Sequence, residues 1–111
     1  MDTVEDLGKS FFRLLDTIGR YKIERKSRSI HITRKRVFVG LHPTKSYLGI
    51  NVVLDRAQAA PPASKVEKVS ANRFHHFYKI TSRKELNKSF VRLLHEAYDL
   101  AQPGSSSTGG F

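Results

Sequence analysis

The amino-acid sequence predicts a two-layer α+β domain, in which an N-terminal and a C-terminal helix cover one face of an antiparallel sheet of four or five strands. Near both ends of the chain, apolar residues recur every three or four positions, which is typical of amphipathic helices. Between these stretches, short segments alternate apolar and polar residues with a period of two, which is typical of strands. A chain of 111 residues is long enough for one domain with a modest core.

The first helix is expected at residues 3–19. Its apolar stripe comprises Val4, Leu7, Phe11, Leu14, Leu15 and Ile18. Asp2 or Thr3 can cap its first turn, because a short polar side chain accepts a hydrogen bond from a backbone N–H there. Gly19 suits a left-handed residue that ends the helix.

The sheet is expected in the middle of the chain. Residues 37–42 and 47–54 alternate most strictly, and the turn Pro43-Thr44-Lys45-Ser46 between them predicts a β-hairpin. Further strand segments are expected at residues 29–33, 66–69 and 74–80, and Tyr21 and Ile23 could begin a short edge strand. Residues 55–64 form a loop, since Pro61 and Pro62 cannot join the interior of a sheet.

The second helix is expected to begin at the capping box Ser82-Arg83-Lys84-Glu85 and to end before Pro103. Its apolar stripe comprises Leu86, Phe90, Leu93, Leu94, Ala97, Tyr98 and Ala101. Residues 103–111 have the composition of a flexible tail. The sequence therefore predicts a single domain over residues 1–102.

Two helices leave the second face of the sheet uncovered. The core is expected to combine the two helix stripes with Val39, Leu41, Leu48, Ile50 and Val52. The uncovered face is expected to show Phe38, Tyr47 and Asn51, together with either His75 and Phe77 or their neighbours Phe74, His76 and Tyr78. Aromatic side chains on such a face often mark a protein interface, so a homodimer is one interpretation.

Positive charge is concentrated in one segment. Residues 20–36 hold eight Lys and Arg against Glu24, so they supply about +7 of the formal net charge of +10. A polyanion would use this charge, because each neutralised phosphate releases a condensed counterion. The residues expected to contact phosphates are Arg25, Lys26, Arg28, Arg34, Lys35, Arg36, Lys45, Arg73 and Lys79. The other interpretation of such a run is a solvated surface without a ligand.

The sequence shows no catalytic, cofactor or metal signature. It contains no cysteine, its ten carboxylates are dispersed, and no glycine-rich nucleotide-binding motif occurs. His75 and His76 are adjacent, so on a strand they point to opposite faces and cannot bind one ion together. His31 and His42 lie on different strands and can converge with only one of them. We therefore expect no catalytic residue, no metal and no cofactor.

The sequence also lacks membrane and export signals. No apolar run approaches the roughly 20 residues that span a bilayer. The N-terminus MDTVEDLGKS is acidic, whereas a signal peptide begins with basic residues. We expect a cytoplasmic protein without a membrane partner.

Residues 11–100 resemble a family of small bacterial domains of unknown function, sometimes labelled predicted transport proteins. The likeness rests on the segments Ile23-Glu24-Arg25-Lys26-Ser27, Phe38-Val39-Gly40-Leu41-His42-Pro43-Thr44-Lys45, Arg73-Phe74-His75-His76-Phe77-Tyr78-Lys79-Ile80 and Leu94-His95-Glu96-Ala97-Tyr98. The resemblance implies an α+β fold and no particular site. Members also occur fused to nuclease-like or other DNA-associated domains, which implies a nucleic-acid context by association alone.

Two hypotheses of function follow from these patterns. The first is a non-enzymatic basic module that binds DNA or RNA through phosphate contacts. The alternative is a protein-interaction or dimerisation module for an acidic partner. Steep salt dependence of DNA binding would favour the first, and a concentration-dependent mass would favour the second.

Overall fold

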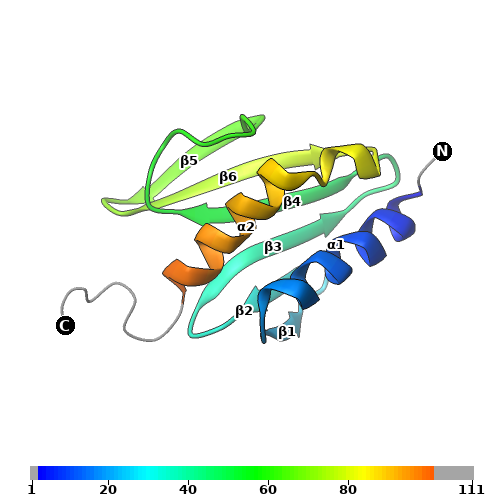
Figure 1. Cartoon of the computed structure of the whole chain (residues 1–111), viewed down its shortest axis with the longest axis horizontal. Coiled ribbons are helices and arrows are strands. Elements are labelled where there is room, and N and C mark those ends of the chain that lie inside the picture. The colour runs from blue at the N-terminus through cyan, green and yellow to red at the C-terminus, as the bar shows by residue number, and fades with distance from the viewer. Residues whose placement is uncertain (1–2, 102–111) are drawn as a thin grey trace.

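The computed structural model describes residues 3–101 and consists of one antiparallel sheet of six strands with an N-terminal and a C-terminal helix. The elements are α1 (Val4–Ile18), β1 (Lys22–Arg25), β2 (Ile30–Thr33), β3 (Val37–Pro43), β4 (Leu48–Leu54), β5 (Lys65–Ser70), β6 (Arg73–Ile80), the 3₁₀-helix η1 (Arg83–Glu85) and α2 (Lys88–Leu100). Both helices lie on one face of the sheet, with α2 crossing β3 and β4 (Figure 1). The predicted α+β class is confirmed; the expected tail at residues 103–111 lies outside the described residues.

The sheet has more strands than the sequence predicts. Its order is β1-β2-β3-β4-β6-β5, so β1 and β5 are the edge strands. Every side chain of both edge strands is exposed. An edge strand has a neighbour on one side only, and the side chains of these two strands stay in contact with solvent. Their sequences therefore lack the strict apolar alternation that marks the central strands, and the prediction of four or five strands was too low.

Helix α1 begins and packs as its sequence predicts. Thr3 is the N-cap, and its hydroxyl accepts a hydrogen bond from the Asp6 backbone N–H at 3.0 Å. Leu7, Phe11 and Leu15 are fully buried, because they recur on the side of the helix that faces the sheet. The alternative cap, Asp2, lies outside the described residues.

Helix α2 begins later than predicted. The capping box at Ser82 and Glu85 is present, but it opens the short helix η1. A second cap then starts α2, because the Asn87 side chain accepts a hydrogen bond from the Phe90 N–H at 3.1 Å. The prediction of one continuous helix from the capping box was therefore wrong: Leu86 leaves the helical conformation between the two caps, with ψ of 60°.

The core lies between the two helices and the sheet. The five strand residues predicted for the core are all buried, namely Val39, Leu41, Leu48, Ile50 and Val52. Three aromatic rings join the layers: Phe90 of α2 packs edge-on against Phe11 of α1 at 6.4 Å and against Tyr78 of β6 at 5.3 Å. These contacts fix α2 over the centre of the sheet.

Phe38 belongs to this core, so its predicted place on the uncovered face was wrong. Ile32 lies opposite Val39 and Thr33 lies opposite Val37, which leaves Phe38 as the extra residue of a β-bulge. Phe38 is buried and packs edge-on against Tyr98 of α2 at 5.5 Å. The bulge interrupts the alternation, so counting residues along β3 gives the wrong face for this side chain.

Gly19 ends α1, although not in the left-handed conformation that the sequence suggested. Its φ of 158° and ψ of −166° are extended with a positive φ. The space beside it is filled by Tyr98, whose hydroxyl donates to the Arg20 carbonyl at 2.8 Å. A Cβ at Gly19 would lie 2.7 Å from Cζ of that ring, so glycine is required by close approach as well as by φ.

Within residues 3–101, neither helix has the length and apolar character needed to cross a membrane.

Candidate functional site

The β1–β2 turn carries the first part of the basic segment. Arg25 ends β1, Lys26 and Arg28 lie in the turn, and all three are exposed. A hydrogen bond from the Lys26 N–H to the Ser29 carbonyl, at 2.8 Å, closes the turn. The Lys26 ammonium also lies 3.4 Å from the Glu24 carboxylate, and such an exposed pair is weak in water. These side chains are therefore accessible to an external anion.

The register of the sheet brings two more predicted residues to the same end. Ile30 follows the β1–β2 turn and lies opposite Leu41, so the β3–β4 turn is next to it. Lys45 lies in the β3–β4 turn, and Lys79 lies opposite Gly49 at the start of β4. We call this set the basic end: Arg25, Lys26, Arg28, Lys45 and Lys79.

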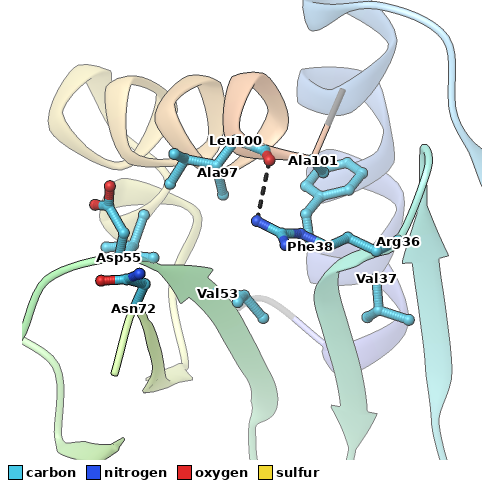
Figure 2. Close-up of a pocket in the computed structure, with 10 residues that line it drawn as sticks. Arg36, Val37, Phe38, Val53, Asp55, Asn72, Ala97, Leu100 and Ala101 are labelled. Carbon is cyan, nitrogen blue, oxygen red and sulfur yellow. Dashed lines mark hydrogen bonds between the residues drawn. The ribbon is translucent and has the colours of Figure 1, made fainter. Parts of the chain in front are cut away.

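The other four predicted residues, Arg34, Lys35, Arg36 and Arg73, lie at the opposite end of the sheet. We call residues 34–36, in the β2–β3 turn, the cap turn. The Arg34 guanidinium donates to the Tyr98 carbonyl at 3.2 Å and lies 3.7 Å from the centroid of its ring. The Arg36 guanidinium donates to the Leu100 carbonyl at 3.1 Å (Figure 2).

The cap turn therefore completes the C-terminus of α2. The last turn of this helix contains no basic residue of its own. Its final carbonyls point out of the helix and carry partial negative charge, which a cation stabilises. The Lys35 backbone N–H adds a hydrogen bond to the Ala101 carbonyl at 3.2 Å. The sequence analysis did not identify this structural role for Arg34 and Arg36.

The space between α2 and the ends of β3 and β4 is too small for a ligand. Figure 2 shows Arg36 below Leu100 of α2, and the ring of Phe38 beside Ala101, which follows the helix. The cavity that these residues line has a volume of about 10 Å³. That is close to the room needed by one water molecule, so no substrate site lies here.

The face of the sheet without helices carries polar and aromatic side chains. Tyr78 and His76 of β6 are buried on the helix side, so the residues that alternate with them lie on the other face. We call this the open face; its central residues are His31, Gly40, His42, Gly49, Asn51, His75 and Phe77. Of the two registers that the sequence left open, the one with His75 and Phe77 on this face is confirmed.

Two histidines of the open face, His42 and His75, have a pKa below the ordinary histidine value. Burial lowers the pKa of His42, and the charge of nearby His31 lowers it further. Burial also lowers the pKa of His75, helped by the charge of Arg73. His75 accepts a hydrogen bond at Nδ1 from the Asn51 side chain at 3.1 Å, which fits a neutral ring.

A groove lies on the open face beside the basic end. Its volume is about 330 Å³, and its lining includes His42, Thr44, Tyr47, Gly49, Ser64, Lys65, Phe77 and Lys79. Two aromatic rings of its lining have a lysine nearby: the Lys79 ammonium is 5.3 Å from the Tyr47 centroid, and the Lys65 ammonium is 5.7 Å from the Phe77 centroid. The groove thus combines flat apolar walls with positive charge.

Lys65 is a site residue that the sequence analysis missed. It begins β5 and lies opposite Phe77 of β6. Strand segments were expected at residues 66–69 and 74–80, so the expected first segment did not reach Lys65. A shift of one residue in the pairing also moves every side chain of a strand to the other face. The pairing of β5 with β6 shifts by one residue between Lys68 and Ser70. No pattern in the sequence predicts this shift.

Among residues 3–101, no group of three or more His, Cys, Asp or Glu side chains is arranged to hold a metal ion. The open-face histidines are flanked by Gly40, Asn51 and Phe77, and the carboxylate of Glu67 lies opposite His75 on β5.

No curated protein and no solved structure shows significant similarity to this chain. Residues 11–101, which run from the middle of α1 through α2 and include the basic end and the groove, match one known family. The chain belongs to the family described as "Domain of unknown function (DUF5655)".

Proposed function

We propose that this domain is a non-enzymatic module that binds DNA or RNA through phosphate contacts at the basic end. The observation that carries the proposal is the convergence of five exposed cations from two adjacent turns and the end of β6. Neighbouring strands are about 4.8 Å apart, so β6 and β1, four strand positions apart, span roughly 19 Å. Cations spread over that length can contact several phosphates of one strand.

The distribution of carboxylates supports this proposal. Six of those in residues 3–101 lie on the helical segments, namely Glu5, Asp6, Asp16, Glu85, Glu96 and Asp99. One of these six already has a cationic partner within the domain. The Glu96 carboxylate pairs with Arg56 at 2.7 Å, and this hydrogen bond lowers the pKa of Glu96. The basic end therefore faces a polyanion with little opposing charge beyond Glu24 and Glu67 at its margins.

The four predicted residues at the opposite end of the sheet are proposed to contribute less to nucleic-acid binding. Lys35 and Arg73 add to the positive field from the other end of the sheet. Arg34 and Arg36 also add to it, but their guanidiniums are already held by carbonyls of α2. Direct phosphate contacts are therefore proposed for the basic end, and a long-range contribution for these four.

A fluorescence-anisotropy titration tests the proposal. We expect a Kd on the order of micromolar at low salt for a generic oligonucleotide, since phosphate contacts dominate. With about five phosphates neutralised, log K should fall against log salt with a slope of about −3.5 for a single strand. Replacing Arg25, Lys26 and Arg28 by Glu together should weaken binding by at least about tenfold.

A matched control separates local contacts from total charge. Replacing Lys9, Lys88 and Arg92 by Glu makes the same change in net charge on the helix side, where all three are exposed. This control should weaken binding far less. Equal losses in the two triple variants would show that binding follows total charge and would remove the phosphate contacts from the basic end. Affinity independent of salt would rule out nucleic acid as the ligand.

One observation favours the alternative of a protein-interaction module. The edge strand β5 exposes Val66 and Val69, at 39% and 53% of their full surface. An exposed edge strand with apolar side chains can pair with a second copy of the chain. Sedimentation at increasing protein concentration tests this alternative. A mass that rises to that of a dimer, and that Val66→Lys returns to the monomer value, would support it.

A further inference from the structure

We propose that the groove on the open face binds an unpaired nucleobase, so that the preferred ligand of this domain is single-stranded nucleic acid. This inference rests on the proposed function and names its substrate class.

The walls of the groove suit a flat ring system. Tyr47 and Phe77 both line it, from the β3–β4 turn and from β6, and both side chains are only partly buried. Gly49 of β4 lies opposite Lys79 of β6, and it has no side chain to fill the space between the two rings. A base could therefore stack against either ring, and base–aromatic stacking is how proteins hold single strands without reading their sequence.

The charges around the groove suit a phosphate attached to that base. Lys65 and Lys79 each lie beside one of the two rings, at 5.7 Å and 5.3 Å from its centroid. An ammonium at the edge of a stacked base is well placed to contact the adjoining phosphate. Lys45, in the β3–β4 turn, continues the positive surface from the groove toward the turn that carries Arg25, Lys26 and Arg28.

The concave shape excludes a paired base. A groove of about 330 Å³ is at the lower end of the range that holds small ligands. Its aromatic rings lie in the walls, whereas the bases of a duplex are stacked inside two backbones. A duplex could contact the lysines but could not place a base against Phe77. The geometry therefore points to a segment of a few unpaired nucleotides, with one base in the groove and its neighbours along the basic end.

Two phenylalanines of β6 provide a matched test. Phe77 faces the groove with Lys65 beside it, whereas Phe74 points to the other face of β6 and has Lys68 at 5.9 Å from its centroid. Phe77→Leu and Phe74→Leu are the same change of ring to branched alkyl. Each variant is titrated with a labelled oligothymidine and with a labelled duplex of equal length, at one salt concentration.

We expect Phe77→Leu to weaken binding of the single strand about tenfold, the loss typical of one base–aromatic stack, and to leave duplex binding unchanged. Phe74→Leu should change neither affinity. Tyr47→Leu should repeat the effect of Phe77→Leu, and Tyr47→Phe, which keeps the ring, should retain the wild-type affinity. Thermal melts of the four variants confirm that they are folded.

The outcomes also separate this inference from the proposed function. Equal losses for single strand and duplex, or no loss in Phe77→Leu, would overturn the nucleobase site. If the basic-end triple variant still lost affinity in that case, the proposed phosphate contacts would stand. If the wild-type protein bound neither oligonucleotide, both proposals would fall.

Discussion

Arg25 and the β1–β2 turn after it hold three basic side chains, as many as the cap turn, but only the cap turn is bound to the C-terminus of a helix. Arg34 and Arg36 donate to the last carbonyls of α2, and Arg34 also lies over the Tyr98 ring. Arg25 and Arg28 project from an exposed turn at the other end of β2. Density of charge along the sequence therefore does not distinguish a cation that caps a helix from one that is open to a ligand.

The side chains around the cap turn are packed against one another, whereas those around the basic end are more exposed. Around the cap turn, Tyr98 contacts Phe38 and Arg34 and donates to the Arg20 carbonyl, so one side chain ties three segments together. The basic end instead adjoins the groove on the open face, where the rings remain partly exposed. We infer that mutations near the cap turn act mainly on stability and that mutations at the basic end act mainly on binding.

Among the variants that test this comparison, Gly19→Ala is expected to have the largest effect, which is a loss of stability. A Cβ there would overlap the Tyr98 hydroxyl and lie 2.7 Å from Cζ, at a φ of 158° that disfavours any side chain. Overpacking and backbone strain together should lower the free energy of unfolding by about 3 kcal/mol. Urea denaturation of the variant and the wild type measures this loss.

Gly40→Ala on the open face is the matched control. A Cβ at Gly40 would lie 3.5 Å from the His42 Nε2, which is an ordinary contact. This variant should differ from the wild type by less than about 1 kcal/mol. Similar urea midpoints for the two alanine variants would show that the packing around Tyr98 is not as tight as described.

A smaller loss of stability is expected when the cap turn loses its guanidiniums. Arg34→Ala combined with Arg36→Ala removes two charge-assisted hydrogen bonds from the C-terminus of α2, and should cost about 2–3 kcal/mol. Arg25→Ala combined with Arg28→Ala makes the same chemical change at the basic end, and should stay within about 0.5 kcal/mol.

The same two double variants should rank in the opposite order for nucleic-acid affinity. The basic-end pair should bind more weakly than the cap-turn pair in the anisotropy titration, because its cations are available to phosphates. If the cap-turn pair bound more weakly while its fold remained intact, the assignment of the two ends would be reversed.

The fold could be predicted where burial imposes a pattern on the chain. The helix stripes and the strict alternation around Ile50 predicted the class, the central hairpin and the core residues of β3 and β4. The edge strands were harder to count because all their side chains are exposed. The bulge at Phe38 escaped prediction because the place of this ring depends on packing against Tyr98 of α2. The second cap before α2 is a local hydrogen bond from the Phe90 N–H to the Asn87 side chain, and it escaped prediction because the capping box just before it is already a complete start signal.

The candidate site was predictable only as a set of charges. Five of the nine proposed phosphate contacts lie at the basic end, because the β3–β4 turn and the end of β6 are at the same end of the sheet as the β1–β2 turn. Sequence spacing cannot show that Arg34 and Arg36 lie under the C-terminus of a helix more than sixty residues away. Lys65 was missed since its face depends on the register of one edge strand.

The smallest expected effect is a dependence of binding on pH. It tests whether phosphates at the basic end bind beside the groove or on the β1–β2 turn alone. Burial and the charge of His31 lower the pKa of His42, so this side chain is neutral at pH 7. It lines the groove together with Tyr47 and Lys79. The free protein takes up this proton only below the ordinary histidine pKa of about 6.5, and a bound phosphate favours the protonated form.

Lowering the pH from 7.5 to 5.5 at constant ionic strength should therefore tighten binding by a few-fold, measured by anisotropy. Over the same range the fold should lose some stability, because a histidine whose pKa is depressed in the folded state stabilises it only above the unfolded pKa. His42→Asn should flatten the pH dependence of binding, whereas His95→Asn, on the exposed side of α2, should leave it as in the wild type. Affinity that did not change with pH in the wild type, or a response kept in His42→Asn, would mean that phosphates bind away from the groove, on the β1–β2 turn alone.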